Sequence, residues 1–399
     1  MLASAAGVAP LPALGFVDEA KLKAELREAV LRHCGGDSIV ESLVTGLGPG
    51  AADSAAGRQT AVVTGDGEVY TADLVVAADG PRSTTRALLF DPPRCGGVAA
   101  SPPGVADIPS ILQPRGYTVF RGRSPSAGGT GGQRVTDRAF QTWGPDIRFA
   151  CVPTATGNAW YIAVSDSLLR ERGFDPDHGL VPAPMSTLFE LCGGWHLPIT
   201  ELLESSASSA GLAGTGTRGG WSSIGDVVVT GQQAVAFARP VPSSLSGIHR
   251  GGLAVAFVGD AAHTLDPILA QGAGVAIEDA TLLATALVGA GGGGGGAFDG
   301  QLAARLAAYE STRQPRVDRL HHISNFAQTV GHVSSPVLCA VRDAVIRATP
   351  AAIKSPVFDH SVRASLGCDS LWQRTSAVQL SDPALAFKAA LVAHRKFDS

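Results

Sequence analysis

The chain has 399 residues, of which 45% are hydrophobic and 17% are charged, and its formal net charge is −4 at pH 7. The basic residues are scattered and form no stripe that would suit a nucleic-acid groove, and no uncharged apolar run approaches the roughly 18 residues of a membrane helix. We expect a soluble protein of two or three domains with a sizeable core, without a nucleic-acid partner or a transmembrane segment. These totals leave its compartment, cytoplasmic or organellar, and its oligomeric state open.

The cysteines are spread along the chain and form no C-x-x-C pair, so neither a zinc site nor a thioredoxin-like motif is expected. We therefore predict no metal centre. In a chain of this length, reduced and mostly buried thiols are the simplest expectation. The six cysteines are Cys34, Cys95, Cys151, Cys192, Cys339 and Cys368.

The first quarter of the sequence predicts a helix, a hairpin and a buried strand. Residues 19–33 carry apolar side chains at helical spacing. Two β-rich runs flank Asp66-Gly67, which is a typical hairpin turn. The second run ends in residues 74–77, which are apolar throughout, as expected for a strand covered on both faces. Residues 91–115 are rich in proline and glycine and predict a crossover loop.

The middle of the chain, from about residue 116 to 249, consists of short β-like segments separated by glycine, proline and serine. One helical segment, near residues 185–192, interrupts them. This pattern predicts an antiparallel sheet that forms a second domain or subdomain. The β-like segments are residues 116–122, 138–144, 147–153, 159–165 and 226–231.

An apolar strand returns at residues 253–258, and a helix-like run follows to about residue 288. The glycine-rich stretch at 289–296 predicts a flexible loop. Two further helices are expected, over residues 301–313 and 316–346, because Pro315 should kink or split a continuous helix. After about residue 350 the periodicity is weak, and we expect a partly ordered tail.

Two apolar strands end in similar acidic turns. The strand at 74–77 leads to Asp79-Gly80, and the strand at 253–258 leads to Gly259-Asp260. Ligands of open α/β sheets lie just beyond the carboxyl ends of the strands. A carboxylate there accepts hydrogen bonds from sugar hydroxyls, and a glycine lets the backbone approach the ligand closely. We therefore expect the two turns to border one ligand site.

After Asp260 the segment "PILAQGAG" reaches the start of a helix at Gly272–Gly274. The free N–H groups and the dipole of a helix start favour negative charge, and glycines there would admit a large flat ligand. The alternative is that Gly272 and Gly274 only permit tight packing of the helix on a strand. His263 and Glu278 are expected to have structural roles.

These segments together resemble the FAD-dependent aromatic hydroxylases, the para-hydroxybenzoate-hydroxylase-like flavoprotein monooxygenases that include salicylate hydroxylase and zeaxanthin epoxidase. "GDAAHTLDPILAQGAGVAIEDATLLA" is similar to the family's Gly-Asp motif and "DLVVAADGPRSTTR" to its Asp-Gly motif. "LAAYESTRQPRV" resembles a family helix, and "GYTVFRGR" resembles a strand that enters the substrate domain. The resemblance covers roughly residues 18–350.

The resemblance implies a mixed α/β fold, with a Rossmann-like FAD-binding domain, an inserted antiparallel-sheet substrate domain and C-terminal helices. The FAD-binding domain would comprise residues 1–110 and 251–350, the substrate domain residues 111–250, and the tail residues 351–399.

The resemblance also implies roles for individual residues. Asp260 would hold the ribityl chain of FAD, and the turns of Gly259 and of Asp79-Gly80 would border the cofactor, the latter near the pyrophosphate. The backbone around Gln271, Gly272, Ala273 and Gly274 would face the isoalloxazine ring. Pro267 would lie against that ring as the catalytic-site residue, and Arg86 would brace the Asp79 turn.

Members of this family begin with a strand, a G-x-G-x-x-G turn and a helix that bind the ADP half of FAD. The N-terminal stretch "GVAPLPALG" has no such spacing, and Glu19 stands where the family has an arginine directed at the cofactor. The sequence therefore resembles an N-terminally truncated hydroxylase. We predict that residues 1–399 alone bind FAD weakly or not at all.

The activity implied is a monooxygenation that uses FAD, NAD(P)H and oxygen. A flavin hydroperoxide would hydroxylate or epoxidise a small aromatic or isoprenoid-like substrate. That substrate would lie between Pro267 and the β-rich region, where Tyr117 and Trp143, and also Phe120 and Trp160, are candidate wall residues. The alternatives are a non-catalytic remnant or gene-model fragment, or another flavin oxidoreductase of the same fold, such as a reductase or halogenase.

Overall fold

The structure is a computed structural model that describes residues 19–50, 59–90, 112–127, 133–212, 227–237, 245–288 and 301–350. The chain divides into two compact units, one of residues 1–42 with 355–399 and one of residues 43–354. In the first unit the predicted helix is confirmed as α1 (Glu19–Cys34). Gly35, with φ of 94°, follows it and leads into the short 3₁₀ helix η1 (Gly36–Ser38).

The second unit begins with a small antiparallel sheet of the strands β1 (Val44–Pro49), β2 (Thr60–Thr64) and β3 (Val69–Ala72). The predicted hairpin is confirmed for β2 and β3, which pair across the Asp66-Gly67 turn, but the expected continuation of its second strand to residue 77 was wrong, because residues 75–77 belong to another sheet. Gly67 has φ of 86°, a conformation that glycine adopts without a steric penalty. Its N–H donates to the Thr64 carbonyl over 2.9 Å and closes the turn.

A second small sheet holds the order β11 (Gly247–Ile248), β12 (Ala254–Phe257) and β4 (Val75–Ala77). All four residues of β12 are buried, and β4 lies parallel to it. The expectation that β4 is covered on both faces was wrong, since Val76 is 47% exposed. The reason is its position: β4 is an edge strand of the described sheet. The short helix α2 (Thr84–Phe90) follows β4.

The largest described sheet has six strands, and every neighbouring pair in it is antiparallel. The predicted β-like segments all fall in it. The crossover loop expected up to residue 115 was wrong at its end, because residues 112–115 belong to a long strand that pairs with residues 235–237. In spatial order the strands are β6 (Phe140–Trp143), β7 (Ile147–Thr154), β8 (Gly157–Ser165), β5 (Leu112–Pro125), β10 (Val228–Phe237) and β9 (Leu180–Pro184).

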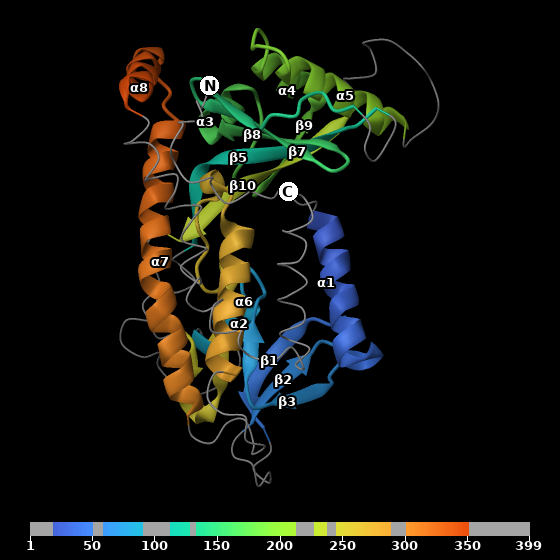
Figure 1. The fold of residues 1–399 in the computed structure, drawn as a ribbon, viewed down its shortest axis with the longest axis vertical. Coiled ribbons are helices and arrows are strands. Elements are labelled where there is room, and N and C mark those ends of the chain that lie inside the picture. Colours follow the sequence, from blue (N-terminus) through green and yellow to red (C-terminus); the bar gives the residue numbers. More distant parts are fainter. Residues whose placement is uncertain are drawn as a thin grey trace. The chain divides into compact units, whose positions relative to one another are not determined.

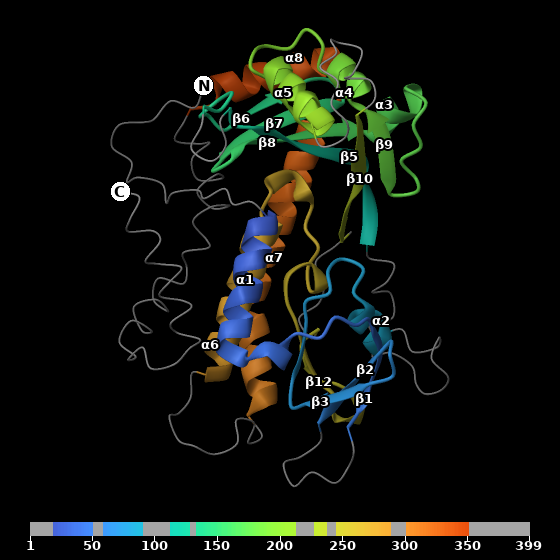
Figure 2. The same ribbon diagram turned by 90° about the vertical axis from the view of Figure 1, so that its right-hand side faces the viewer.

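One face of this sheet packs on helices. Figure 2 shows α4 (Met185–Leu191) and α5 (Ile199–Leu212) over the strands, and α3 (Asp166–Glu171) follows β8. The core beneath them contains Phe120, Phe149 and Trp160, all fully buried. Gly122 makes room for it, because a Cβ there would lie 2.0 Å from the Trp160 ring. The predicted helix near residues 185–192 is thus confirmed as α4.

The helices α6 (Gly272–Val288) and α7 (Leu302–Gly331) lie side by side (Figure 1), and α8 (Pro336–Ala348) follows. The prediction that Pro315 splits the helix was wrong, since α7 runs through Pro315 and the next break falls at residues 332–335, whereas a kink at Pro315 stays a prediction. A proline inside a helix costs about 3 kcal/mol. Burial of Val317 and Leu320 against Val275 of α6 offsets that cost.

The thiols of Cys151, Cys192 and Cys339 are free and buried, as expected, whereas that of Cys34 is free and exposed. Cys95, Cys368, the glycine-rich stretch at 289–296 and the tail from residue 351 lie outside the described residues. Among the helices of the described ranges, none has the length and apolarity to cross a membrane.

Candidate active site

The two acidic turns lie next to each other. β4 and β12 are parallel neighbours with Ala77 opposite Phe257, and the Val258 N–H donates to the Ala77 carbonyl over 3.0 Å. Since the carboxyl ends of parallel neighbours meet at one edge of a sheet, Asp79 and Asp260 follow their strands at the same edge. The juxtaposition that the sequence predicted is therefore present.

The turn after β4 is held by its own side chains. The Asp79 carboxylate accepts the Thr85 N–H over 2.9 Å, and Gly80 has φ of 82°. Burial would raise the pKa of Asp79, but hydrogen bonds from the Ser83 hydroxyl and from Thr85 lower it overall. Asp79 is thus an exposed carboxylate that remains ionised and orders its turn.

Arg86 connects the two acidic turns. Its guanidinium donates to the Pro81 carbonyl and to the Ala261 carbonyl, each over 2.6 Å. The side chain is buried, and its fork of N–H groups suits two acceptors at once. Arg86 therefore braces the Asp79 turn, as the sequence suggested, and also fixes it to the turn that contains Asp260.

The turn after β12 is the short helix η6 (Gly259–Ala261), packed tightly on α6. Gly259 has φ of 59°, and a Cβ there would lie 3.1 Å from the Cβ of Ala276. Its N–H donates to the buried Asp279 carboxylate over 2.7 Å. Gly259 is thus required by backbone conformation and by close approach of the helix.

The Asp260 carboxylate is different, because among the described residues no hydrogen bond or ion pair reaches it. It is half-buried, and burial raises its pKa, with His263 lowering it and Asp279 raising it further. The partly exposed carboxylate is thus able to accept hydrogen bonds from a donor outside the protein.

The start of α6 faces this carboxylate. Gly272, Ala273 and Gly274 are exposed, and the first amides of a helix have no partner within it. A Cβ on Gly272 would meet nothing nearer than the Asp260 Oδ1, at 3.8 Å, and one on Gly274 nothing nearer than the Gln271 Oε1, at 3.7 Å. Tight helix–strand packing therefore does not explain these two glycines.

A buried network of ion pairs lies next to the Asp260 turn and binds it through the Gly259 N–H. The Asp279 carboxylate lies 2.7 Å from the His263 Nε2 and 2.6 Å from the Arg313 Nε. Arg313 and Arg316 both pair with Glu278, at 2.8 and 3.1 Å. Burial would raise the pKa of Asp279, but His263 and Arg313 lower it overall. His263 and Glu278 thus have structural roles, and Glu278 is buried.

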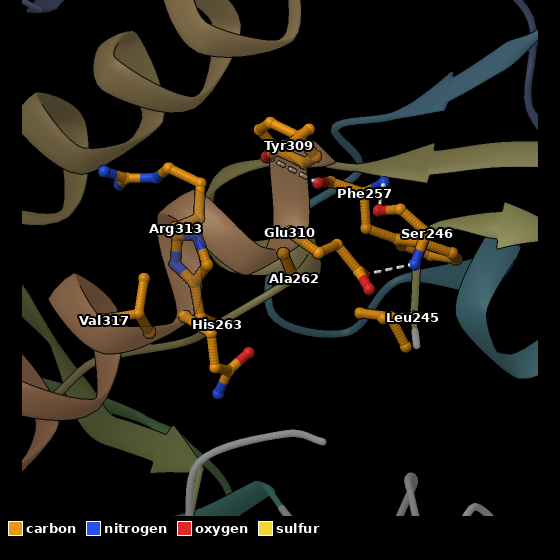
Figure 3. Close-up of a pocket in the computed structure, with 10 residues that line it drawn as sticks. Leu245, Ser246, Phe257, Ala262, His263, Tyr309, Glu310, Arg313 and Val317 are labelled. Atoms are coloured by element: carbon orange, nitrogen blue, oxygen red, sulfur yellow. Dashed lines mark hydrogen bonds between the residues drawn. The ribbon is translucent and has the colours of Figure 1, made fainter. Parts of the chain in front are cut away.

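Beside this network lies a small cavity of about 40 Å³, lined by His263, Tyr309, Glu310 and Arg313 among others (Figure 3). Glu310 accepts the Ser246 N–H over 2.5 Å, and burial raises the pKa of its carboxyl. The space suffices for water, which needs roughly 10–15 Å³, but not for a cofactor.

Pro267 begins the short helix η7 (Pro267–Leu269) on the segment between Asp260 and α6. Asp266 caps it by accepting the Ile268 N–H over 3.0 Å. Sequence reasoning missed Asp266, although an aspartate before a proline is a frequent helix start. Ala270, at the end of this turn, has φ of 53°, which is uncommon for a residue with a Cβ.

Two of the four aromatic candidates lie on the sheet face opposite α4 and α5. Tyr117 and Trp143 share that face, whereas Phe120 and Trp160 lie in the core. Tyr117 is fully buried, and its hydroxyl donates to Asp266 over 2.6 Å. The Trp143 indole N–H donates to Gln141, and the Arg342 guanidinium lies 5.4 Å from the centre of the Trp143 ring.

No group of three histidine, cysteine or acidic side chains within the described ranges could hold a metal ion.

Residues 246–324 match a family whose description is FAD binding domain. The chain is 28% identical over 284 residues to aurachin C monooxygenase/isomerase of Stigmatella aurantiaca, covering 71% of this chain and 57% of that protein. It is 28% identical over 287 residues to 3-amino-4-hydroxybenzoate 2-monooxygenase of Streptomyces cremeus, covering 71% and 56%. The chain thus spans little more than half the length of these relatives.

The fold is shared with solved structures. HpxO of Klebsiella pneumoniae, complexed with FAD and uric acid, matches with a TM-score of 0.54 and 19% identity, over 85% of this chain and 71% of that one. The expected mixed α/β fold is therefore confirmed.

Proposed function

We propose that this chain, which carries an FAD-binding domain segment and is related to FAD-dependent monooxygenases, binds FAD and acts in monooxygenation of a small organic substrate with NAD(P)H and oxygen. The observation that supports this most directly is the unpartnered Asp260 carboxylate facing the open, glycine-lined start of α6. That pair offers an acceptor for hydroxyls and donors for an anionic ring edge at one place.

The described residues fit the ribityl and ring half of the cofactor. Asp260 would accept hydrogen bonds from the ribityl hydroxyls, and the N–H groups of Gly272 and Ala273 would face the carbonyl edge of the ring. Gly259, Gln271 and Gly274 would line the same space. Pro267 would lie against the ring, and the turn of Asp79 and Gly80 would face the pyrophosphate.

When bound, FAD would supply the redox and oxygen chemistry, and the protein would supply positioning and shielding. The positive end of α6 would stabilise negative charge on the ring. A substrate would lie near the sheet face that carries Tyr117 and Trp143. We expect an aromatic or isoprenoid-like substrate, with hydroxylation or epoxidation as the reaction.

Of the described residues, only the Asp79-Gly80 turn is proposed to face the ADP half, so we expect that half to be held weakly. A non-catalytic remnant is the second candidate. Flavin titrations of residues 1–399 separate the two. We expect FAD and riboflavin to bind with Kd values within about tenfold of each other, since only the shared half is held.

Two results would decide against parts of this proposal. If neither flavin binds, the proposed function fails and the remnant is favoured. If FAD copurifies at near one per chain, or binds more than about a hundredfold more tightly than riboflavin, the weak hold on the ADP half is wrong. Substrate-stimulated NAD(P)H oxidation by flavin-loaded protein then tests the monooxygenase itself.

A further inference from the structure

We propose that Asp266 is a positioning residue that fixes residues 264–271, the Pro267 segment, to β5 of the substrate sheet. The contacts of its carboxylate, which we call the latch, would keep the ring side of the flavin site and the substrate face in a fixed relative position. This inference deepens the proposed function and rests on it for its catalytic consequence, although the latch itself is a property of the ligand-free chain.

The Asp266 carboxylate joins elements that are far apart in sequence. Its Oδ1 accepts the Tyr117 hydroxyl over 2.6 Å and the Ile268 N–H over 3.0 Å. Its Oδ2 accepts the Arg115 Nε–H over 2.8 Å. The carboxylate is fully buried, and a buried charge is stable only when it is paired and hydrogen-bonded in this way.

Further contacts hold the partners in place. The Arg115 guanidinium also donates to Asn325 of α7 over 2.7 Å, and Gln328 donates to the Arg115 carbonyl over 3.1 Å. On the other side of the segment, the Phe237 N–H of β10 donates to the Thr264 carbonyl over 2.9 Å. The Pro267 segment is therefore tied to two strands of the sheet and to α7.

Tyr117 is a donor that does not ionise under ordinary conditions. Burial raises the pKa of its hydroxyl, and the negative charge of Asp266 raises that pKa further. Its ring stacks on His332, with the ring centres 4.2 Å apart. Tyr117, which the sequence predicted to line the substrate site, therefore donates its hydroxyl hydrogen to Asp266 in the latch.

The latch affects the proposed flavin site through the backbone that follows Asp266. Ala270 adopts a left-handed conformation two residues after Ile268 and just before the start of α6. Such a conformation in a residue with a Cβ persists only where surrounding contacts hold it. Asp266 supplies such contacts on the N-terminal side of Ala270. Loss of these contacts should therefore make both Pro267 and the amides at Gly272 more mobile.

Hydrogen exchange on the full chain tests the latch without any cofactor. Asp266→Asn keeps an oxygen for the Ile268 N–H but removes the charge that pairs with Arg115. We expect amide exchange in residues 264–271 to accelerate roughly tenfold or more, with residues 147–165 unchanged. Ile162→Val, a mild change in the fully buried core of the sheet, is the control for general destabilisation and should leave residues 264–271 unchanged.

The second readout is riboflavin binding. Asp266→Asn should raise the Kd roughly tenfold and alter the absorbance envelope of the bound ring, whereas Ile162→Val should do neither. Tyr117→Phe, which keeps the ion pair and removes one donor, should accelerate exchange in the same residues by a smaller factor, and it replaces Asp266→Asn if that variant does not fold.

Unchanged exchange of residues 264–271 in both variants would overturn the latch. If exchange accelerates and wild-type protein binds no flavin, the latch stands and the proposed function fails. If wild-type protein binds riboflavin and Asp266→Asn binds it equally well with the same spectrum, Asp266 has a structural role only, and the positioning role is wrong.

Discussion

Gly272→Ala distinguishes a glycine that leaves room for a ligand from one that leaves room for the protein. A Cβ on Gly272 meets only the Asp260 Oδ1, at 3.8 Å, which is ordinary van der Waals contact. Without ligand, the free energy of unfolding should therefore change by no more than about 1 kcal/mol, with helix propensity favouring an increase. The same methyl group enters the space between the helix start and Asp260, so the Kd for riboflavin should rise roughly tenfold, or about 1.4 kcal/mol.

Gly259→Ala is the matched control in the same turn region. A Cβ on Gly259 would lie 3.1 Å from the Ala276 Cβ, and the residue has φ of 59°. The left-handed conformation costs a residue with a Cβ about 1–2 kcal/mol, and overpacking adds about 1–3 kcal/mol. The free energy of unfolding of the ligand-free protein should therefore fall by about 2–5 kcal/mol.

Urea denaturation followed by tryptophan fluorescence, with no flavin present, measures both stabilities, and quenching of riboflavin fluorescence measures the affinity. The reasoning is refuted if Gly272→Ala loses more than about 2 kcal/mol without ligand, because the glycine is then needed by the protein itself. Wild-type affinity for riboflavin in that variant would refute it equally.

Three further substitutions test the charges of the site. Burial raises the pKa of Asp260 above 3.8, so the folded chain binds that proton more tightly than the unfolded one and loses stability as pH rises through the raised pKa. Asp260→Asn should remove this loss of stability. Urea denaturation should therefore show a higher free energy of unfolding for the variant than for wild type at about pH 7, but not at about pH 4. Asp279→Asn breaks a buried network and should lower the free energy of unfolding by about 3–5 kcal/mol, measured in the same way. Arg86→Met leaves the Pro81 and Ala261 carbonyls without their donors and should cost about 1–3 kcal/mol for each; an unchanged denaturation midpoint would contradict the bracing role.

Local signals predicted several elements of the fold. The Asp66-Gly67 turn, the helix at 19–33 and the apolar run at 253–258 each have a pattern contained in a few neighbouring residues. The adjacency of the Asp79 and Asp260 turns also followed, because two apolar strands with the same ending point to one sheet edge. These features depend on short-range conformation and on one general rule of sheet topology.

Features that depend on partners distant in sequence were not predictable in the same way. Residues 112–115 were predicted to be part of a loop, because a proline such as Pro114 is disfavoured in a central strand. In the structure they belong to β5, which pairs with β10. Pro315 was predicted to kink or split a helix, because the free-energy cost of a proline depends only on its neighbours in sequence. The burial that offsets this cost comes from contacts with α6, which is distant in sequence. The sequence alone did not assign the four aromatic candidates to a sheet face, because the register that decides the face is set by neighbouring strands.

Asp279 and Asp260 lie in the same turn region, but their charges are stabilised in different ways. Asp279 is fully buried and satisfied by His263, Arg313 and the Gly259 N–H, so its charge stabilises the fold. Asp260 feels that same charge, has no partner of its own among the described residues and is held half-buried at a helix start. A chain selected for stability alone would gain by neutralising Asp260, whereas a hydroxyl-bearing ligand at this position would turn the same carboxylate into a binding group.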